Sequence, residues 1–335
     1  MVPDQQGLIL AGDVGGTNAR FAAFDPSKGF HAPVWERTVP SRSATSFAEV
    51  LGRVRPEVPG RVGAATFGVA GPVRHGVCRA TNLPWVVDSK EVAAALRLPS
   101  IGLLNDLEAN AWGIDVLVDA DLATLQSGVA DPDGPTALVS AGTGLGEAGT
   151  IMVDGARRPF ACEGGHSSFS PNSEREVRLW RRLSAVHGHV SWERVLSGPG
   201  LVAVYEFVRD EEGASDAEPV ARSKGTDDHG MAILKAATDG SSAVADRALE
   251  FFAALYGSEV GNTALEFLAT GGVYLGGGLA PRLLSWLKRP AFLEGFRAKG
   301  RMRPILESIP VRVILEPRAA LFGAARHAAQ SGATR

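Results

Sequence analysis

Two short apolar runs separated by a glycine-rich tip open the chain. The stretch LILAGDVGGTNARFAAFD, residues 8–25, has apolar residues on both sides of GDVGGTN, which is typical of two strands joined by a turn. The same reasoning predicts strands over residues 32–40 and 61–73, helices over residues 46–58 and 85–98, and a strand that runs into a helix over residues 100–114. Asp88 is expected to begin the second of these helices.

The middle of the chain repeats the shape of its opening. The stretch TALVSAGTGLGEAGTIMVDG, residues 136–155, has the same two apolar runs around a glycine-rich tip, about 130 residues after the first copy. Two such strand–turn–strand units predict two similar lobes. Beyond them we expect a charged, solvated loop over residues 209–230 and a helix over residues 243–269. Residues 271–284 predict a strand, a glycine tip and a helix. Residues 311–329 predict a strand followed by a helix that Pro317 can begin. This alternation favours an α/β fold.

Length and composition favour a two-lobed globular protein. The chain has 335 residues, which is more than a single hydrophobic core usually supports. The net charge of −3 gives no basic surface for nucleic acid or an anionic membrane. The apolar stretch at residues 267–281 is too short and too glycine-rich for a membrane helix. Because no signal peptide is recognisable, we expect a cytoplasmic protein.

The cysteine count excludes a cysteine-rich metal site. Only Cys78 and Cys162 are present, so one disulfide stays open but a four-cysteine zinc cluster is impossible. His187 and His189 stand close together, yet no third ligand is near them, and we interpret them as structural. No structural zinc is expected.

Glycine-rich tips occur at residues 12–17, 142–146, 164–165 and 276–278, and any one of them alone is explained as a tight turn. A Walker A loop needs Gly-Lys followed by Ser or Thr, which the chain lacks. The dinucleotide fingerprint occurs formally as Gly144, Gly146 and Gly149. That fingerprint must open a helix, whereas the TIMVDGARR sequence after it predicts a strand, so we interpret the match as accidental.

A third way to bind phosphate uses backbone amides at the tips of the two strand pairs. Successive N–H groups in a turn form a concave anion site, and glycine lets the backbone approach the anion closely. Residues 12–18 and 142–146 each offer such a set, and Thr17 and Thr143 add hydroxyl groups at matching places. An ATP phosphate tail held between the two tips explains why the unit occurs twice.

Six longer motifs follow one another along the chain: GDVGGTNARF, NDLEANAWGI, SAGTGLGEA, EGGHSSFSPNSE, GHVSWERVLSGPGL and GGVYLGGGLAPR. Together they resemble the bacterial glucokinases of the hexokinase type, from about residue 8 to residue 328. That family belongs to the ATPase superfamily of actin and Hsp70. The resemblance implies an α/β, duplicated, two-lobed actin-like (ribonuclease H-like) fold with a central cleft. It implies a small domain of residues 1–115 plus 317–335 and a large domain of residues 116–316.

The resemblance assigns ATP binding to the glycine tips. It implies that the two phosphate loops and an adenosine-binding pair consist of Gly12, Asp13, Val14, Gly15, Gly16, Thr17, Gly142, Thr143, Gly144, Gly277 and Gly278. Mg²⁺ should arrive with ATP and keep most of its water, with Asp13 as its indirect protein partner. A turn-stabilising acceptor is the alternative role for Asp13. Glu147 departs from the family, where a small or apolar residue is expected, and it would repel phosphate unless it points away or meets Mg²⁺.

The resemblance also implies a sugar site of five polar residues: Asn105, Asp106, Glu163, His166 and Glu193. Each sugar hydroxyl that loses water must regain a hydrogen-bond partner, which these side chains can supply. Asp106 is the candidate general base for the 6-hydroxyl of glucose, because an ordinary aspartate is ionised at pH 7. By its position alone, between a strand and a helix, Asp106 is equally well explained as a helix cap. Without the resemblance, His166 would be read as structural and Glu193 as a surface acid.

The resulting hypothesis is an ATP-dependent glucokinase that makes glucose 6-phosphate and ADP, the first step of glycolysis. A kinase for a different hexose and a non-catalytic sugar sensor with the same fold are the alternatives, and an actin-like filament or chaperone ATPase is a third. The presence of Asp106 argues against a sensor, and Glu163, His166 and Glu193 argue against a filament or chaperone. The resemblance implies a homodimer.

Overall fold

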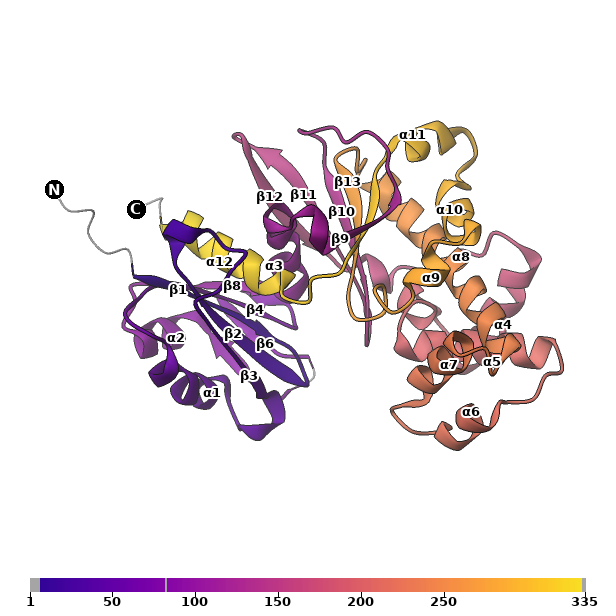
Figure 1. Cartoon of the computed structure of the whole chain (residues 1–335), viewed down its shortest axis with the longest axis horizontal. Coiled ribbons are helices and arrows are strands. Elements are labelled where there is room, and N and C mark those ends of the chain that lie inside the picture. Colours follow the sequence, from indigo (N-terminus) through magenta and orange to yellow (C-terminus); the bar gives the residue numbers. More distant parts are fainter. Residues whose placement is uncertain (1–6, 82, 333–335) are drawn as a thin grey trace. The chain divides into compact units, whose positions relative to one another are not determined.

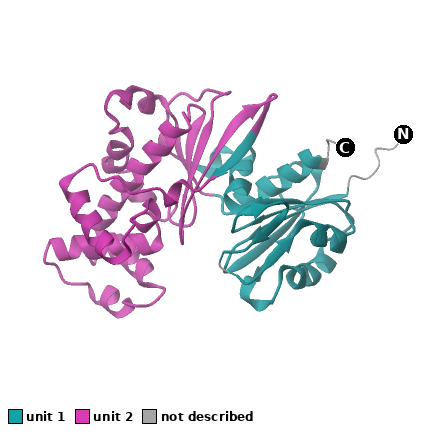
Figure 2. Ribbon diagram, turned by 180° about the vertical axis from the view of Figure 1, so that it is seen from behind, with its two compact units in different colours: residues 1–122, 158–161, 316–335 teal, residues 123–157, 162–315 magenta. Residues whose placement is uncertain are grey.

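The computed structural model describes residues 7–81 and 83–332, and the chain divides into two compact units (Figure 2). Unit 1 contains residues 1–122, 158–161 and 316–335, and unit 2 contains residues 123–157 and 162–315. Each unit has its own sheet and its own hydrophobic core. Within the described part of the chain, no helix is long and apolar enough to cross a membrane.

The sheet of unit 1 joins antiparallel strands to parallel ones. Its strands are β1 (Leu8–Val14), β2 (Asn18–Phe24), β3 (Trp35–Pro40), β4 (Val62–Val69) and β8 (Gly102–Asn105), in the order β3-β2-β1-β4-β8. β1 pairs antiparallel with β2 and parallel with β4, and β4 pairs parallel with β8. A small antiparallel sheet contains β5 (Val73–Arg74), β6 (Val77–Arg79) and β7 (Val86–Asp88). The main strands lie where the apolar pattern predicts them.

Helices cover both faces of the main sheet of unit 1 (Figure 1). They are α1 (Phe47–Val54), α2 (Ser89–Leu96), α3 (Asp106–Gly113) and α12 (Ala319–Gly332). α1 and α2 share a core with Leu10 and Phe21, whereas α12 shares another with Ile9 and Phe24. Successive side chains of a strand point to opposite faces, so the neighbours Ile9 and Leu10 belong to different cores. The predicted cap of α2 is confirmed, because the Asp88 carboxylate accepts a hydrogen bond from a backbone N–H of its first turn.

α3 and α12 pack against each other with their backbones in contact. A Cβ atom added to Gly323 of α12 would lie closer than 3.0 Å to the carbonyl oxygen of Ala109 in α3. A Cβ atom on Gly113 of α3 would come equally close to the carbonyl oxygen of Ala319. Glycine is therefore needed at both positions, and the C-terminal helix fixes the position of the helix that begins with Asp106.

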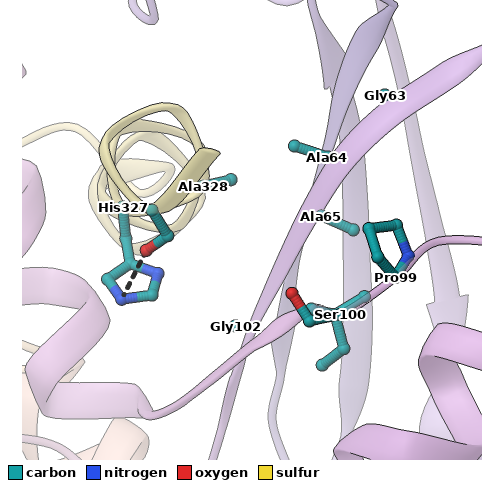
Figure 3. A pocket seen from close by; sticks show the side chains of 10 residues that line it. Gly63, Ala64, Ala65, Pro99, Ser100, Gly102, His327 and Ala328 are labelled. Carbon is teal, nitrogen blue, oxygen red and sulfur yellow. Dashed lines mark hydrogen bonds between the residues drawn. The ribbon is translucent and has the colours of Figure 1, made fainter. Parts of the chain in front are cut away.

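A small pocket of unit 1 lies beside α12 and the strands β4 and β8 (Figure 3). His327 of α12 points into it, with its Nδ1 atom 3.0 Å from the Thr66 hydroxyl and its Nε2 atom 3.4 Å from the Ser331 hydroxyl. Burial lowers the pKa of His327 to about 4, and the positive charge of Arg158 acts in the same direction. His327 is therefore neutral at physiological pH.

The lowered pKa of His327 predicts a loss of stability in acid. An ordinary histidine in the unfolded chain binds a proton below about pH 6.5, whereas His327 in the folded protein does so only near pH 4. Between these values the unfolded state binds more protons, so stability should fall by on the order of 2 kcal/mol as the pH decreases. Urea unfolding at about pH 7 and about pH 4.5 measures this loss, which should be smaller in His327→Gln. Equal losses in both proteins would assign the effect to another group.

The second main sheet repeats the strand order of the first, and it lies in unit 2 except for Leu122 and residues 158–161 at its edges, which belong to unit 1. Its strands are β9 (Leu122–Gln126), β10 (Thr136–Ala141), β11 (Leu145–Val153), β12 (Ala156–Cys162), β13 (Gly272–Gly276) and β14 (Val311–Ile314), in the order β12-β11-β10-β13-β14-β9. β10 pairs antiparallel with β11 and parallel with β13, and β13 pairs parallel with β14. Both units thus place a hairpin beside two parallel strands, which confirms the predicted duplicated α/β fold. The formal dinucleotide fingerprint is followed by the strand β11 and not by a helix. This agrees with the interpretation of the match as accidental.

Eight helices are described in unit 2: α4 (Glu174–His187), α5 (Gly198–Glu211), α6 (Glu218–Ser223), α7 (His229–Thr238), α8 (Ala243–Glu266), α9 (Leu284–Leu287), α10 (Pro290–Arg297) and α11 (Arg303–Ser308). α8 is the helix predicted over residues 243–269, and it is buried along most of its length. Most of the segment predicted as a solvated loop, residues 209–230, is exposed as expected. It is not a loop throughout, because it contains the end of α5, all of α6 and the start of α7. Val220 anchors α6 in the core, and Arg209 pairs with Asp216 at 3.0 Å.

Candidate active site

The β1–β2 hairpin presents the first predicted phosphate loop at its tip. The N–H of Gly15 donates to the carbonyl oxygen of Asn18 at 3.0 Å, which closes the turn. Ser41 holds the turn from behind, since its hydroxyl donates to the Gly15 carbonyl oxygen at 2.7 Å and its N–H to the Thr17 carbonyl oxygen at 2.9 Å. The N–H groups of Gly16 and Thr17 meet no backbone acceptor in the described part of the chain. These amides are available to an anion.

Two residues of the predicted loop, Gly12 and Val14, are packed in the core of unit 1 and do not lie at the tip. Val14 is 1% exposed and belongs to the core with α1. Gly12 lies against Phe67, whose ring would be closer than 3.0 Å to an added Cβ atom. Packing therefore accounts for the glycine at position 12.

Asp13 and Asp106 form a pair of interacting carboxylates in unit 1. Asp13 lies in β1 opposite Arg20 of β2. Burial raises the pKa of Asp13 to about 6, the charge of Arg20 opposes this rise, and the charge of Asp106 adds to it. A desolvated carboxylate with a second one nearby is stabilised by a cation.

Asn105 caps helix α3, and Asp106 is the first residue of that helix. The Oδ1 atom of Asn105 accepts a hydrogen bond from the N–H of Leu107 at 2.9 Å, and its Nδ2 atom donates to the carbonyl oxygen of Gly71 at 3.0 Å. The carboxylate of Glu108 in the first turn also interacts with the backbone N–H of Asn105. The explanation of Asp106 as the helix cap is therefore wrong, because Asn105 does that work.

The β10–β11 hairpin presents the second predicted phosphate loop. The N–H of Gly142 donates to the carbonyl oxygen of Gly144 at 2.8 Å, and the N–H of Gly198 donates to the carbonyl oxygen of Gly142 at the same distance. Thr143 is exposed at this tip, as Thr17 is at the first one. The two tips thus match in residue type and in exposure.

Gly277 and Gly278 lie directly beside the second tip. A Cβ atom added to Gly277 would lie closer than 3.0 Å to the carbonyl oxygen of Ala141, and the φ angle of Gly277 is +78°. The N–H of Leu279 donates to the same carbonyl oxygen at 3.1 Å. Only glycine combines this left-handed backbone with such a close approach. The residues predicted to hold adenosine therefore adjoin the second phosphate loop.

Three of the five predicted sugar residues lie together in unit 2. The Nε2 atom of His166 is 3.9 Å from Oε2 of Glu163, and its Nδ1 atom is 3.9 Å from Oε1 of Glu193. Oε2 of Glu193 also accepts a hydrogen bond from the N–H of Leu145, directly after the second tip, at 3.0 Å. The side chains of Glu163 and His166 are 78% and 59% exposed, so they are open to a ligand. These residues and the second tip form one continuous cluster.

Two neighbouring loops carry this cluster and bind each other. The N–H of Trp192 donates to the carbonyl oxygen of Ser167 at 3.0 Å, and the N–H of Phe169 donates to that of Val190 at 2.9 Å. The rings of Phe169 and Trp192 pack edge to face, with centroids 4.8 Å apart. Buried aromatic side chains therefore fix the spacing between His166 and Glu193.

Glu147 does not face the second tip. Its side chain is 2% exposed and interacts with Glu259 and Thr263 of α8, inside unit 2. Of the two arrangements that avoid repulsion of a phosphate, the structure shows the one in which the acid points away.

A protein-bound metal ion requires a group of ligand side chains that lie close together. No group of three or more His, Cys, Asp or Glu residues that could hold a metal ion occurs among residues 7–81 and 83–332. Cys78 and Cys162 are free thiols, so they form no disulfide. His189 lies with its Nε2 atom 3.2 Å from the Ser168 hydroxyl.

Comparison with known proteins identifies the family. A family model described as glucokinase matches residues 10–331. The chain belongs to the glucokinase family. A glucokinase of a Nostoc species is 38% identical over 340 residues, which cover 96% of this chain and 99% of the relative. The crystal structure of glucokinase from an Antarctic psychrotroph is 30% identical, with a TM-score of 0.82, and covers 96% of this chain and 99% of that chain.

A more distant glucokinase structure agrees with this fold. The ROK family glucokinase of Streptomyces griseus, solved with glucose and AMPPNP, has a TM-score of 0.67 over 97% of this chain and 100% of that one. Its identity of 23% limits this similarity to the fold. Glucokinases have the two-lobed actin-like ATPase fold, and the repeated strand order of the two units is its signature. The predicted family and fold are confirmed.

Two contacts that support the glycine-rich hairpin tips of this glucokinase-family chain were not predicted from the sequence. Ser41 reaches back across 26 residues to Gly15, and no local motif announces that contact. Gly198 donates to Gly142 from the first turn of α5. The SGPG sequence signals the start of that helix, but not what its N–H would bind.

Proposed function

We propose that this chain transfers the γ-phosphoryl group of ATP to the 6-hydroxyl of D-glucose, giving glucose 6-phosphate and ADP, with Asp106 as the general base. One observation carries the proposal: within unit 2, Glu163, His166 and Glu193 adjoin the backbone amides of the second glycine tip. A polyol and a phosphate chain bound to these groups would be neighbours. Membership of the glucokinase family supports the same reaction.

The chemistry needs positioning, charge compensation and one proton acceptor. As the 6-oxygen of glucose attacks the γ-phosphorus in line, a new O–P bond forms and the bond to the β,γ-bridging oxygen breaks, so that ADP leaves. Asp106 takes the hydroxyl proton during this attack. Its place at the start of α3 is held by the Asn105 cap and by the contact with α12. The amides of the two tips compensate the charge of the phosphates.

Sugar recognition would rest on the five predicted residues. Glu163 and Glu193 accept hydrogen bonds from hydroxyl groups, and His166 bonds through a ring nitrogen. Among the described residues, Oδ1 and Nδ2 of Asn105 each make one hydrogen bond, and each retains one more position for a sugar hydroxyl. Asn105 would thus hold both the helix of the base and the substrate.

Mg²⁺ bound with ATP is part of the proposal. The partly desolvated Asp13 carboxylate, next to Asp106 and beside the first tip, suits a hydrated divalent cation. When bound, the ion would reduce the negative charge of the phosphates. Asp13 would hold it through water, and Arg20 would keep the carboxylate ionised.

An ADP-coupled assay tests the function. We expect ADP formation with glucose, and lower kcat/KM with fructose, mannose and N-acetylglucosamine, because the five polar groups must match each hydroxyl. No turnover with any hexose, from folded protein that binds ATP, would contradict the proposal and favour a sugar sensor. A higher kcat/KM with another hexose would change the substrate and keep the reaction. The homodimer implied by the resemblance stays a prediction, which light scattering measures.

A further inference from the structure

A second pair of carboxyl groups lies inside unit 2, beneath the sugar cluster. Glu147 of β11 and Glu259 of α8 are electrostatically coupled neighbours inside unit 2, and they are 2% and 3% exposed. Oε1 of Glu147 is buried and accepts no hydrogen bond from an N–H or hydroxyl group of the described residues. Two carboxylates cannot donate to each other, so a hydrogen bond between them requires a proton on one of them.

The other contacts of Glu259 fix its orientation. Its Oε2 atom accepts a hydrogen bond from Nδ2 of Asn262 at 2.8 Å. The ammonium group of Lys299 donates to Oδ1 of Asn262 at 2.6 Å and lies 3.3 Å from the Ser258 hydroxyl. Lys299 is therefore linked to the pair through Asn262. Its positive charge interacts with Glu259 without a direct ion pair in the described structure.

Burial and mutual repulsion both favour a bound proton. Burial raises the pKa of Glu147, and burial together with the charge of Glu147 raises the pKa of Glu259. The other titratable or charged groups around the pair and its neighbours are Tyr256, Cys162, Glu163, Glu176, Glu266 and Lys299. Among them Glu266 raises the pKa of both carboxyls. Two charges cannot be held this close in a buried site at low cost.

The sugar-binding turn rests directly on Glu147. A Cβ atom added to Gly164 would lie closer than 3.0 Å to Oε2 of Glu147, and one added to Gly165 would come as close to the carbonyl oxygen of Leu145. The thiol of Cys162 also donates to the carbonyl oxygen of Glu147 at 3.6 Å. The two glycines of the GGH turn thus let its backbone lie on β11 and on the Glu147 carboxyl group.

We propose that Glu147 and Glu259 share one proton and that this bonded pair is the support on which the turn Gly164–His166 rests. Glu147 and Glu259 are positioning residues, since they touch no substrate and act through the turn. Loss of the shared proton separates the two carboxylates, shifts the turn and moves Glu163 and His166 away from the sugar. This inference rests on the proposed function for the identity of the sugar, and on unit 2 alone for the support.

The consequence is a glucose affinity that depends on pH. As the pH rises and the pair loses its proton, KM for glucose should increase on the order of tenfold for each pH unit past the transition, while kcat changes little. KM for ATP should stay constant over the same range. Removal of uniform binding energy has this signature, whereas general damage to the fold would lower kcat as well.

Glutamine variants test the shared proton. Glu147→Gln and Glu259→Gln each replace the proton with an amide N–H, so each should keep a low KM for glucose and lose the rise between about pH 7 and about pH 9.5. Glu147→Ala removes the support and should raise KM for glucose at every pH. Cys162→Ser and Lys299→Arg serve as controls, because a thiol or an amine could also titrate in this range, and both should keep the wild-type profile. A rise in KM as steep in both glutamine variants as in the wild type would overturn the proposal.

Stability gives an independent readout. Both carboxyls have a pKa above the ordinary value of 4.5 in the folded state, so the stability that they contribute is full below that pH and is lost as the pH rises through the folded values. Urea unfolding of the wild type should show this decline, and both glutamine variants should show a shallower one. If no hexose is turned over but calorimetric glucose binding keeps the predicted pH dependence, the support stands and the proposed function fails. Parallel declines in all three proteins would contradict the shared proton even in an active enzyme.

Discussion

Replacing Asp106 with alanine should lower kcat by about 10²–10⁴-fold while glucose still binds. The base acts only as the proton leaves the 6-hydroxyl, so its loss is felt in the transition state more than in the bound substrate. Asn105, not Asp106, caps α3, and the helix should therefore keep its first turn in the variant. Steady-state ADP formation gives kcat, and calorimetric titration with glucose gives Kd.

The exposed Asp119 of the same unit provides the control. Its side chain lies outside the candidate site, and Asp119→Ala should keep kcat within a factor of about two. If Asp106→Ala keeps most of its kcat, the assignment of the base is wrong. If both variants lose activity and stability together, damage to unit 1 explains the loss, and the role of Asp106 as a base is contradicted.

Replacing Gly323 with alanine should destabilise the protein by about 2–3 kcal/mol, although alanine is the better helix former. The added Cβ would overlap the carbonyl oxygen of Ala109, which belongs to the backbone and cannot rotate away. α12 and α3 must move apart, and with them the first residue of α3. We therefore expect a lower midpoint in urea unfolding and a lower kcat in the same variant.

Gly52→Ala is the matched control for this helix substitution. Gly52 lies in α1 on the exposed side, and an added Cβ there would meet no atom within 4 Å. The substitution should stabilise the protein by about 0.5–1 kcal/mol through helix propensity alone. A stability gain for Gly323→Ala similar to that for Gly52→Ala would show that the helix contact is looser than described.

The duplicated architecture was predictable because its signal is local. Each hairpin consists of two apolar runs around a glycine tip, and the second copy at residues 136–155 was recognisable beside the first. Strand pairing then follows from chain neighbours, as β1 with β2 and β10 with β11. In both sheets, two parallel strands lie next to the first strand of the hairpin, so the strand order is the same: β2-β1-β4-β8 in one sheet and β11-β10-β13-β14 in the other.

Long-range contacts between polar or small residues were not predictable in this way. No residue near Glu147 in the sequence indicates that it contacts Glu259. The two acids interact only because β11 packs on α8. In the charged segment at residues 209–230 the helix α6 was not predicted. Its charges bind one another, as Arg209 binds Asp216, and Val220 is the one large apolar residue of the segment that anchors the helix. The polar residue types therefore predicted that this segment is exposed, but not that part of it is helical.

The candidate site was predictable in its residue types and only partly in its geometry. The three sugar residues of unit 2 meet as the resemblance implies, through loops fixed by Phe169 and Trp192. The sequence does not show that both ends of the Asn105 amide form hydrogen bonds, because the partner of its Nδ2 atom, Gly71, lies 34 residues away. The cap explanation for Asp106 failed for a simple reason: the residue before it is an equally good cap, and the strand ends there.

Unit 1 is built from segments that lie before and after unit 2 in the chain, so it cannot be completed on the ribosome until unit 2 has been synthesised. The sheet face formed by Ile9, Ala22 and Phe24 is covered by α12, whose residues are synthesised after unit 2. Unit 2 is continuous from residue 162 to residue 315 and emerges in full before that helix does. The nascent chain therefore carries an uncovered apolar sheet face throughout the synthesis of unit 2. A chain that ends before Leu321 leaves that face exposed for good, so termination between unit 2 and α12 produces an aggregation-prone protein.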